Sequence, residues 1–364
     1  MKFNIVRSTF IDGLKAVQNI VAAKNTYPIL QNVLLEANGE DLKLTTTDLD
    51  LSIVNTVKCE VKEAGSSTLP VKLLSNSVMR APEGVIDVDI DESAKGKLLA
   101  GSFSARIVGK TADEFPPFKI EGDSFKYTLP RQSLYEMFRK TQYAAGQDDT
   151  RRTLKGVLMS FKDAKLTVVA TDGRRLAMVE QEFEFPKDYE KDYIIPSKTI
   201  QELLRSLPGE GEVVIKAQNT KICFEFGSMT ISSKLVDDVY PNYVQVIPGA
   251  CSERVAIDRQ LLVNALERAS VITMDEAHSI RLIFEGNKLT VLSAASEIGE
   301  AKDEVPIKYA GEKVEILFDP NFLIDPLKAI DDDEIYIEFN DGKSPAMIKC
   351  SIPFLYVVMP LRIS

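Results

Sequence analysis

The sequence is poor in the residues that most often carry metal or redox chemistry. It has one histidine, His278, and neither a neighbouring cysteine nor a second histidine to complete a metal site with it. The cysteines are far apart and form no CxxC pair, so their spacing suggests neither a zinc site nor a disulfide framework. They are Cys59, Cys223, Cys251 and Cys350. We therefore expect neither a metal nor another cofactor.

Long apolar runs are also missing. No segment approaches the length of a membrane span, and residues 1–7 alternate as in a strand, without the apolar stretch of a signal peptide. The chain of 364 residues is 45% hydrophobic and 27% charged, the balance of a globular protein with several cores. We expect a cytoplasmic protein without a membrane partner.

Signs of catalysis are weak. Gly109-Lys110-Thr111 ends like a phosphate-binding loop, but Ser104 occupies the place of its leading glycine. Two acidic runs, 237–238 and 331–334, could be imagined as metal ligands, yet both fall in predicted turns and neither recurs along the chain. Solvated loops explain them better. We expect a protein that is not an enzyme.

The most informative positive feature is a threefold repeat. An apolar segment that ends in Leu-Thr recurs at Leu44, Leu166 and Leu289, which lie 122 (166 − 44) and 123 (289 − 166) residues apart. A period this long corresponds to a whole domain rather than to a solenoid unit. We expect three copies of one fold, with domains at residues 1–122, 123–250 and 251–364.

Each copy reads as strand and helix, then strands, then strand and helix again. Alternating β-branched runs such as 85–90, 221–226 and 334–339, separated by turn pairs such as Asn38-Gly39, predict mostly antiparallel sheets. Ser8 is the predicted cap of the first helix, and further helices should follow Pro70, Pro196 and Pro320. The last of these is the weakest prediction, because Pro326 would lie inside it. The fold class is α+β.

Charge is distributed unevenly. The whole chain carries −10, which by itself argues against a nucleic-acid partner. The six predicted helices (8–22, 71–81, 131–142, 197–206, 259–270 and 320–330) hold eleven bases and five acids, so 11 − 5 gives +6 and leaves −16 elsewhere. Adding the predicted caps Asp258 and Asp319 reduces the helix charge to +4 without changing its sign.

Two interpretations of the basic helices remain open. Helix surfaces can be basic by chance. Alternatively, six equivalent helices present basic faces to one polyanion, which would give salt-dependent binding that ignores base sequence. The bases concerned are Lys15, Lys72, Arg80, Arg131, Arg139, Lys140, Lys198, Arg205, Arg259, Arg268 and Lys328.

Four short segments, in this order, resemble a known family. They are Thr150-Arg151-Arg152-Thr153-Leu154-Lys155-Gly156-Val157, Ala170-Thr171-Asp172-Gly173-Arg174-Arg175-Leu176-Ala177, Tyr240-Pro241-Asn242-Tyr243 and Tyr356-Val357-Val358-Met359-Pro360-Leu361-Arg362-Ile363. Together with the repeat, they make the whole chain similar to the bacterial DNA sliding clamp, the beta subunit of DNA polymerase III. The resemblance implies a DNA-clamp fold of three domains and a head-to-tail homodimer that closes into a ring, with helices inside and antiparallel sheets outside.

The resemblance also implies one hydrophobic pocket per chain for short peptides of partner proteins. These partners would be the replicative polymerase alpha subunit, the clamp loader and repair proteins. Apolar side chains would bury the anchors of the peptide, and Met359 could repack for different ligands. The expected pocket residues are Arg151, Leu154, Thr171, Gly173, Arg174, Arg175, Leu176, Pro241, Val246, Val357, Met359, Pro360, Leu361 and Arg362. Taken alone, the C-terminal segment could equally be a last strand in a core.

Two further surfaces follow from the resemblance. Duplex DNA, held independently of its sequence, would face Lys24, Lys72, Arg80, Lys198 and Arg205. The dimer interface would use apolar and acidic residues of the third domain, the acids facing bases of the first domain such as Lys72. These residues are Val271, Ile272, Glu297, Glu300, Asp303 and Glu304. Such a processivity factor would work in the cytoplasm, at the nucleoid.

The sequence departs from the family pattern at two places. Gln245 stands where a basic residue often precedes the position of Val246, so we expect one contact at the rim of the pocket to be either missing or neutral. The loop 146–150 is acidic, which disfavours a role in contacting DNA. A static scaffold that never meets DNA is the remaining alternative, and it would leave the basic helix faces without a task.

Overall fold

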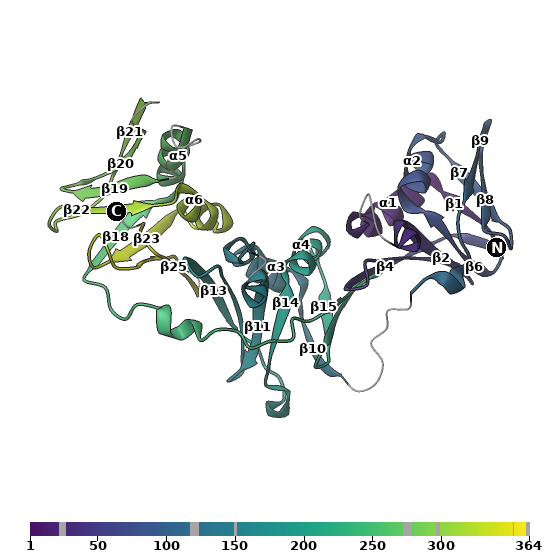
Figure 1. Ribbon diagram of the computed structural model, residues 1–364, viewed down its shortest axis with the longest axis horizontal. Coiled ribbons are helices and arrows are strands. Elements are labelled where there is room, and N and C mark those ends of the chain that lie inside the picture. The colour runs from purple at the N-terminus through teal and green to yellow at the C-terminus, as the bar shows by residue number, and fades with distance from the viewer. Residues whose placement is uncertain are drawn as a thin grey trace. The chain divides into compact units, whose positions relative to one another are not determined.

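The chain folds into two compact units, whose helices and strands are labelled in Figure 1. The computed structural model describes residues 1–21, 27–116, 124–148, 151–271, 279–295, 299–351 and 353–361. The first unit combines Met1–Leu134 with Gln201–Leu235, and the second combines Tyr135–Ile200 with Val236–Ser364. The central third of the sequence therefore contributes to both units. The three predicted domain boundaries stay a prediction.

The first unit is built from two antiparallel sheets. One has the strand order β5 (Glu60–Glu63), β1 (Lys2–Val6), β7 (Val85–Ile90), β8 (Lys95–Ala100) and β9 (Phe103–Val108). The other has the order β10 (Phe125–Pro130), β15 (Glu212–Ala217), β16 (Lys221–Phe226), β17 (Met229–Lys234), β4 (Leu51–Lys58), β3 (Asp41–Thr47), β2 (Asn32–Asn38) and β6 (Gly65–Pro70). Two helices, α1 (Arg7–Val17) and α2 (Val71–Arg80), pack together in this unit.

The second unit repeats this plan. Its larger sheet has the order β14 (Lys191–Pro196), β11 (Gly156–Lys162), β12 (Lys165–Thr171), β13 (Arg175–Glu182), β25 (Phe354–Val358), β24 (Ala346–Lys349), β23 (Glu334–Phe339) and β18 (Glu253–Asp258). Its smaller sheet has the order β21 (Gly299–Pro306), β20 (Lys288–Ala295), β19 (Ile280–Glu285) and β22 (Val314–Phe318). Helices α5 (Arg259–Ser270) and α6 (Pro320–Ala329) lie side by side here. The remaining helices, α3 (Arg131–Arg139) and α4 (Ser197–Ser206), come from the central sequence copy.

Each eight-stranded sheet joins two sequence copies. It takes four strands from the central copy and four from a neighbouring copy, joined by β17 and β4 in the first unit and by β13 and β25 in the second. The sequence predicted antiparallel sheets and six helices, and both predictions are confirmed for the described residues. It did not predict that the sheets run on from one copy to the next.

Strand pairing corrects the register of the repeat. In each copy, the two residues that flank a tight turn are paired: Asn38 with Asp41, Lys162 with Lys165, and Glu285 with Lys288. Leu42 is therefore the counterpart of Leu166 and Leu289, and the predicted match with Leu44 was wrong by two residues. Because side chains alternate with a period of two, this shift leaves every side chain on the predicted face.

The first helix of each copy starts directly after a strand. The predicted cap Ser8 is wrong: Val6 is the N-cap residue, without a side-chain hydrogen bond, and the helix starts at Arg7. The Arg7 N–H instead donates to the Gly84 carbonyl at 2.9 Å, so the chain itself satisfies this helix end. The predicted caps Asp258 and Asp319 are confirmed, because their carboxylates accept from the backbone N–H groups of Leu261 and Asn321.

The arginine that begins each of these helices holds the end of the second helix. Arg7 Nε donates to the Val78 carbonyl at 3.1 Å, and Arg259 Nη1 donates to the Leu327 carbonyl at 3.2 Å. Arg131 donates to four carbonyls within residues 206–210. A cation at a helix C-terminus satisfies carbonyls that lack a partner in the helix. Two of the eleven helix bases, Arg131 and Arg259, are thus committed within the fold.

Helix α6 forms although Pro326 lies inside it. Proline has no N–H, so the carbonyl four residues earlier, that of Phe322, loses its helical partner. The Tyr356 hydroxyl donates to this carbonyl at 2.7 Å. Burial raises the pKa of Tyr356, so the donor stays protonated. One tyrosine on β25 therefore compensates for the proline.

We predict opposite effects for two neighbouring tyrosines. Tyr356→Phe should lower the free energy of unfolding by about 1–3 kcal/mol, because it leaves the Phe322 carbonyl without a partner. Tyr143 is the matched control: its ring lies 6.1 Å from that of Tyr356, and its buried hydroxyl has no hydrogen-bond partner among the described residues. Tyr143→Phe should leave stability unchanged or raise it. Urea midpoints test both, and equal losses would contradict this account.

Candidate functional site

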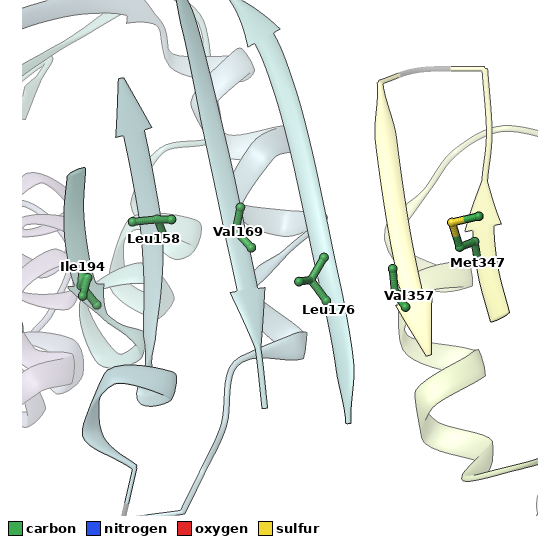
Figure 2. Close-up of a cluster of buried hydrophobic side chains, with 6 residues drawn as sticks. All are labelled: Leu158, Val169, Leu176, Ile194, Met347 and Val357. Carbon is green, nitrogen blue, oxygen red and sulfur yellow. The ribbon is translucent and has the colours of Figure 1, made fainter. Parts of the chain in front are cut away.

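An apolar pocket of about 300 Å³ lies in the second unit, where β13 meets β25. Its floor is formed by Leu176 and Val357, which pair directly at the centre of a row of buried side chains on neighbouring strands (Figure 2). The row consists of Ile194, Leu158, Val169, Leu176, Val357 and Met347. The volume is at the lower end for ligand pockets, about 300–1,000 Å³, and suits a few apolar side chains.

A tight loop between β12 and β13 forms one rim of the pocket. The Asp172 carboxylate accepts from the N–H groups of Arg174 and Arg175 at 2.8 and 3.0 Å, and the Gly173 N–H donates to the Thr171 hydroxyl at 3.1 Å. Gly173 has φ +88°, a conformation that glycine adopts without strain. The Met359 N–H donates to the Arg174 carbonyl at 2.9 Å, which ties the opposite wall to this loop.

Aromatic and flexible side chains form the other walls. Met359 is 41% exposed at the mouth, and Tyr243 packs against the buried row. Tyr240 packs beside it, with ring centroids 6.5 Å apart. Burial raises the pKa of both tyrosines, so both hydroxyls stay protonated at neutral pH. The Tyr240 hydroxyl donates to the Val169 carbonyl at 3.5 Å, and only Tyr243 lines the cavity. The pocket can therefore hold an apolar ligand and offer it a few polar contacts.

The corresponding junction of the first unit serves as an internal comparison. Its β3–β4 loop has the same hydrogen bonds, from the Leu49 N–H to the Thr47 hydroxyl and from the Leu51 N–H to the Asp48 carboxylate. The pair that corresponds to Leu176 and Val357 is Ser52 and Ser232. The first unit thus forms the same junction without an apolar floor. Of the two junctions, only that of the second unit has one.

The structure brings most of the predicted pocket residues together. Those that line the cavity are Arg151, Leu154, Thr171, Gly173, Arg174, Arg175, Leu176, Pro241, Val246, Val357 and Met359. Pro360 and Leu361 instead line an adjoining cavity with Arg281 and Lys343. Arg362 lies outside the described residues. The role of each residue stays a prediction.

Sequence reasoning missed two lining residues, Asn242 and Tyr243. Both stand in the Tyr240–Tyr243 turn, so their position next to Pro241 was the available signal. Gln245 is exposed and is not among the described residues that line the pocket. Arg175 lines the pocket as predicted, and its guanidinium also contacts Asp172, Asp325 and the Tyr143 carbonyl.

The predicted DNA-facing bases lie on helices α2 and α4. Lys72, Arg80 and Lys198 are exposed, and Arg205 is exposed while forming an ion pair with Glu202. Lys24 lies outside the described residues. Several other helix bases are committed to ion pairs: Arg139 and Lys140 with Glu136, Arg268 with Asp303, and Lys328 with Glu267. The basic surface is smaller than the helix count suggested.

The predicted interface residues lie at the edge of the smaller sheet of the second unit. Glu300, Asp303 and Glu304 are on β21, an edge strand, and Val271 is 62% exposed after α5. Asp303 pairs with Arg268 at 2.5 Å, and Glu304 pairs with Lys302 at 2.9 Å. Ile272 and Glu297 lie outside the described residues. In the first unit, β5 and β9 are the edges of the five-stranded sheet.

The described residues include no group of three or more His, Cys, Asp or Glu side chains placed to hold a metal ion. Within the same residues, no helix is both long and apolar enough to cross a membrane.

Comparison with known proteins defines the class. Profiles of the DNA polymerase III beta subunit match residues 1–119 (N-terminal domain), 128–242 (central domain) and 244–362 (C-terminal domain). The beta sliding clamps of Chlamydia muridarum and Pseudomonas aeruginosa are 31% and 33% identical to the chain, and each alignment covers all of this chain and at least 99% of the relative.

Solved structures agree. The DNA polymerase III subunit beta from Bartonella birtlesii, bound to griselimycin, has a TM-score of 0.95 at 32% identity, with full coverage of both chains. The Caulobacter crescentus beta sliding clamp has a TM-score of 0.91 at 30% identity, also over both full chains, and carries polyethylene glycol at a putative beta-motif tethering region.

These matches define a DNA-clamp fold of three domains with antiparallel sheets and helices. The chain belongs to the family of bacterial beta sliding clamps, the beta subunit of DNA polymerase III. It is a processivity factor of DNA replication, and this family is not catalytic. The predicted family, fold class, function and lack of enzyme activity are confirmed.

Proposed function

We propose that the pocket at the β13–β25 junction is the site where this clamp takes peptides from its replication partners. The observation that carries the proposal is its apolar floor, centred on Leu176 and Val357, which the matching junction of the first unit replaces with serines. A peptide anchor that buries apolar side chains there gains roughly 25 cal/mol per Å². Arg151 and Arg174 at the rim add positive charge, which favours an acidic or carboxyl-bearing peptide.

The partners that we propose are the polymerase alpha subunit, the clamp loader and repair proteins. All would share one pocket per chain and therefore compete for it. A polymerase held on a ring that surrounds DNA stays at high effective concentration near the primer end, even when the peptide contact is only moderately tight. Such a protein would act in the cytoplasm, at the nucleoid.

The ring itself is proposed to be a head-to-tail homodimer. Strand β21 of the second unit and an edge strand of the first unit, such as β9, leave backbone groups unpaired. A heterologous contact between them satisfies both edges and closes after two chains. Glu300 on β21 and Arg106 on β9 give the two edges opposite charges that suit this contact.

DNA contact is proposed for Lys72, Arg80, Lys198 and Arg205, with Lys24 as a fifth base. Phosphate contacts contribute affinity without reading bases, so removing each cation should weaken binding uniformly across sequences. Replacing the four described bases with alanine should reduce the salt dependence of DNA binding. The expected change in log–log slope is up to about one for each phosphate that the variant no longer neutralises.

This prediction is tested by measuring DNA affinity against salt for the wild type and the four-fold variant, on two unrelated duplexes. Lys62, Lys187 and Lys308 provide the control, because they are exposed and lie outside the six α-helices. Their replacement should leave the slope unchanged. If the helix variant keeps the slope of the wild type, the bases do not face DNA, and a scaffold that never meets DNA becomes the better account.

A further inference from the structure

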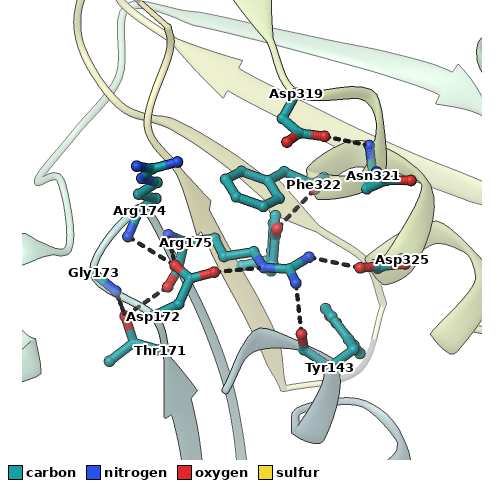
Figure 3. Close-up of polar contacts among 11 residues, drawn as sticks. Tyr143, Thr171, Asp172, Gly173, Arg174, Arg175, Asp319, Asn321, Phe322 and Asp325 are labelled. Carbon is teal, nitrogen blue, oxygen red and sulfur yellow. Dashed lines mark hydrogen bonds and ion pairs between the residues drawn. The ribbon is translucent and has the colours of Figure 1, made fainter. Parts of the chain in front are cut away.

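At the β13 wall of the pocket, the Arg175 side chain joins three separate segments (Figure 3). Nε donates to the Asp172 carboxylate at 3.1 Å, Nη1 to the Asp325 carboxylate at 2.7 Å, and Nη2 to the Tyr143 carbonyl at 2.7 Å. The side chain is only 11% exposed. We call this set of contacts the Arg175 bracket. Each of the three guanidinium nitrogens thus donates a hydrogen bond within the protein.

The environment keeps the bracket charged. Burial opposes the charge, but Tyr356, Asp325 and Asp172 outweigh it and raise the pKa of Arg175 above its ordinary value. The Phe322 ring on α6 covers the guanidinium, with its centroid 4.4 Å from the guanidinium carbon. A buried ion pair that is hydrogen-bonded on every side holds a defined geometry, and removal of one partner leaves an uncompensated charge.

The bracket connects the two halves of the pocket. Asp172 begins the loop that places Gly173 and Arg174 on the rim, and it belongs to the central domain. Asp325 and Phe322 lie on α6, in the C-terminal domain, which also supplies the Val357 wall. The described residues that line the pocket include none from α6. Asp325 can therefore affect a ligand in the pocket only through Arg175 and the elements it holds.

The fold does not need this arginine to join two copies. At the matching junction of the first unit, the residue paired across the strands is Leu51, where the second unit has Arg175. Leu51 is buried, and the same loop hydrogen bonds form around it. The bracket and the apolar floor therefore occur together at the junction of the second unit. Both are missing from the corresponding junction of the first unit, where serines replace the floor. This association indicates a role in the pocket rather than in folding.

We propose that Arg175 and Asp325 are positioning residues for the partner pocket, and that they couple its occupancy to helix α6. This inference rests on the proposed function of the pocket as a peptide site. Binding of a peptide across the two halves tightens the bracket and thereby stabilises α6. By linkage, a weaker contact between the bracket and α6 lowers the affinity of the pocket for the peptide.

The test uses full-length protein and a fluorescein-labelled peptide that carries the clamp-binding segment of the polymerase alpha subunit. Asp325→Asn, which keeps the shape of the side chain, should weaken peptide binding about five- to thirty-fold by fluorescence polarisation. Arg175→Met should weaken it at least as much, and the double variant should be no worse than Arg175→Met alone. Non-additivity of this kind identifies residues that act through one contact.

The effect of the peptide on amide hydrogen exchange distinguishes lost coupling from a general loss of stability. Peptide binding should slow amide exchange in α6 of the wild type, and it should not do so in Asp325→Asn. Lys328→Met is the matched control, because it removes the ion pair of α6 with Glu267 at 2.7 Å on the same helix. This variant should bind the peptide within two-fold of wild type and keep the response of α6.

The outcomes separate the two proposals. If the wild type binds the peptide and a Met359→Asp change in the pocket wall abolishes binding, the pocket assignment holds. The bracket proposal is then overturned if Asp325→Asn binds the peptide as tightly as wild type, or if α6 responds to the peptide equally in both proteins. If Met359→Asp binds normally, the peptide lies elsewhere, and the pocket assignment and the bracket proposal both fail.

Discussion

Replacing both Leu176 and Val357 with serine should abolish partner binding. The polymerase should then make products as short as those it makes without a clamp. The two side chains pair at the centre of the pocket floor, and the variant offers a partner anchor no apolar surface at either position. A partner anchor that loses its apolar contact with both side chains should bind at least about ten-fold more weakly, which corresponds to about 1.4 kcal/mol. Peptide polarisation measures the affinity, and primer extension measures the consequence.

The chain itself indicates that this variant can fold. Ser52 and Ser232 occupy the matching positions in the first unit, where both are buried between paired strands. Circular dichroism and solution mass should therefore match the wild type, apart from a lower melting temperature. Met359→Asp changes an exposed wall rather than the floor and should have the same effect on binding. Products of wild-type length from both variants would place the partner site elsewhere.

Introducing glutamate at Val271 and Ile272 should convert the clamp into a monomer. Val271 is 62% exposed at the end of α5, and an exposed apolar residue beside an edge strand suits a protein interface. Charges buried in such an interface without partners cost several kcal/mol, enough to dissociate a dimer at micromolar concentration. The measured mass should fall from twice 40.4 kDa to 40.4 kDa.

A matched control is available on the same unit. Val239 is 85% exposed and lies away from β21 in the sequence, so Val239→Glu adds the same charge to another exposed valine. It should leave the dimer intact. A dimer that survives the Val271 and Ile272 changes would show that the interface lies elsewhere.

Much of the fold could be predicted because each copy of the repeat is recognisable from residues that are close together in the sequence. Leu166 and Leu289 stand in the same place in their hairpins, and the strands of residues 85–90, 221–226 and 334–339 have the predicted bounds. The apolar floor and the loop with Gly173 were also within reach, since family motifs carry them. Neighbours in the sequence determine the repeat, the strands and the Gly173 loop, whereas the floor joins Leu176 to the distant Val357 and was predicted only through the family motifs.

Long-range contacts explain what sequence reasoning missed. Helix α6 tolerates Pro326 because Tyr356, on a later strand, donates to the carbonyl that the proline leaves free. Arg175 lines the pocket as predicted, but its contacts with Asp325 and the Tyr143 carbonyl join residues that are far apart in the sequence. Arg131 was counted as a surface base, although its guanidinium closes the end of α4. In each case a single side chain found a partner that only the tertiary structure brings near.

The central claim is that this chain acts as a closed ring which slides on DNA and tethers its partners. Retention on DNA tests it most directly: the clamp is loaded onto nicked circular DNA, filtered at about 0.5 M salt to screen phosphate contacts, and measured again after one cut linearises the circle. We predict that the wild type stays on the circle and leaves the linear form, while the Val271 and Ile272 variant is retained on neither. Equal retention on circular and linear DNA would contradict the account, because it would mean that contacts rather than topology hold the protein.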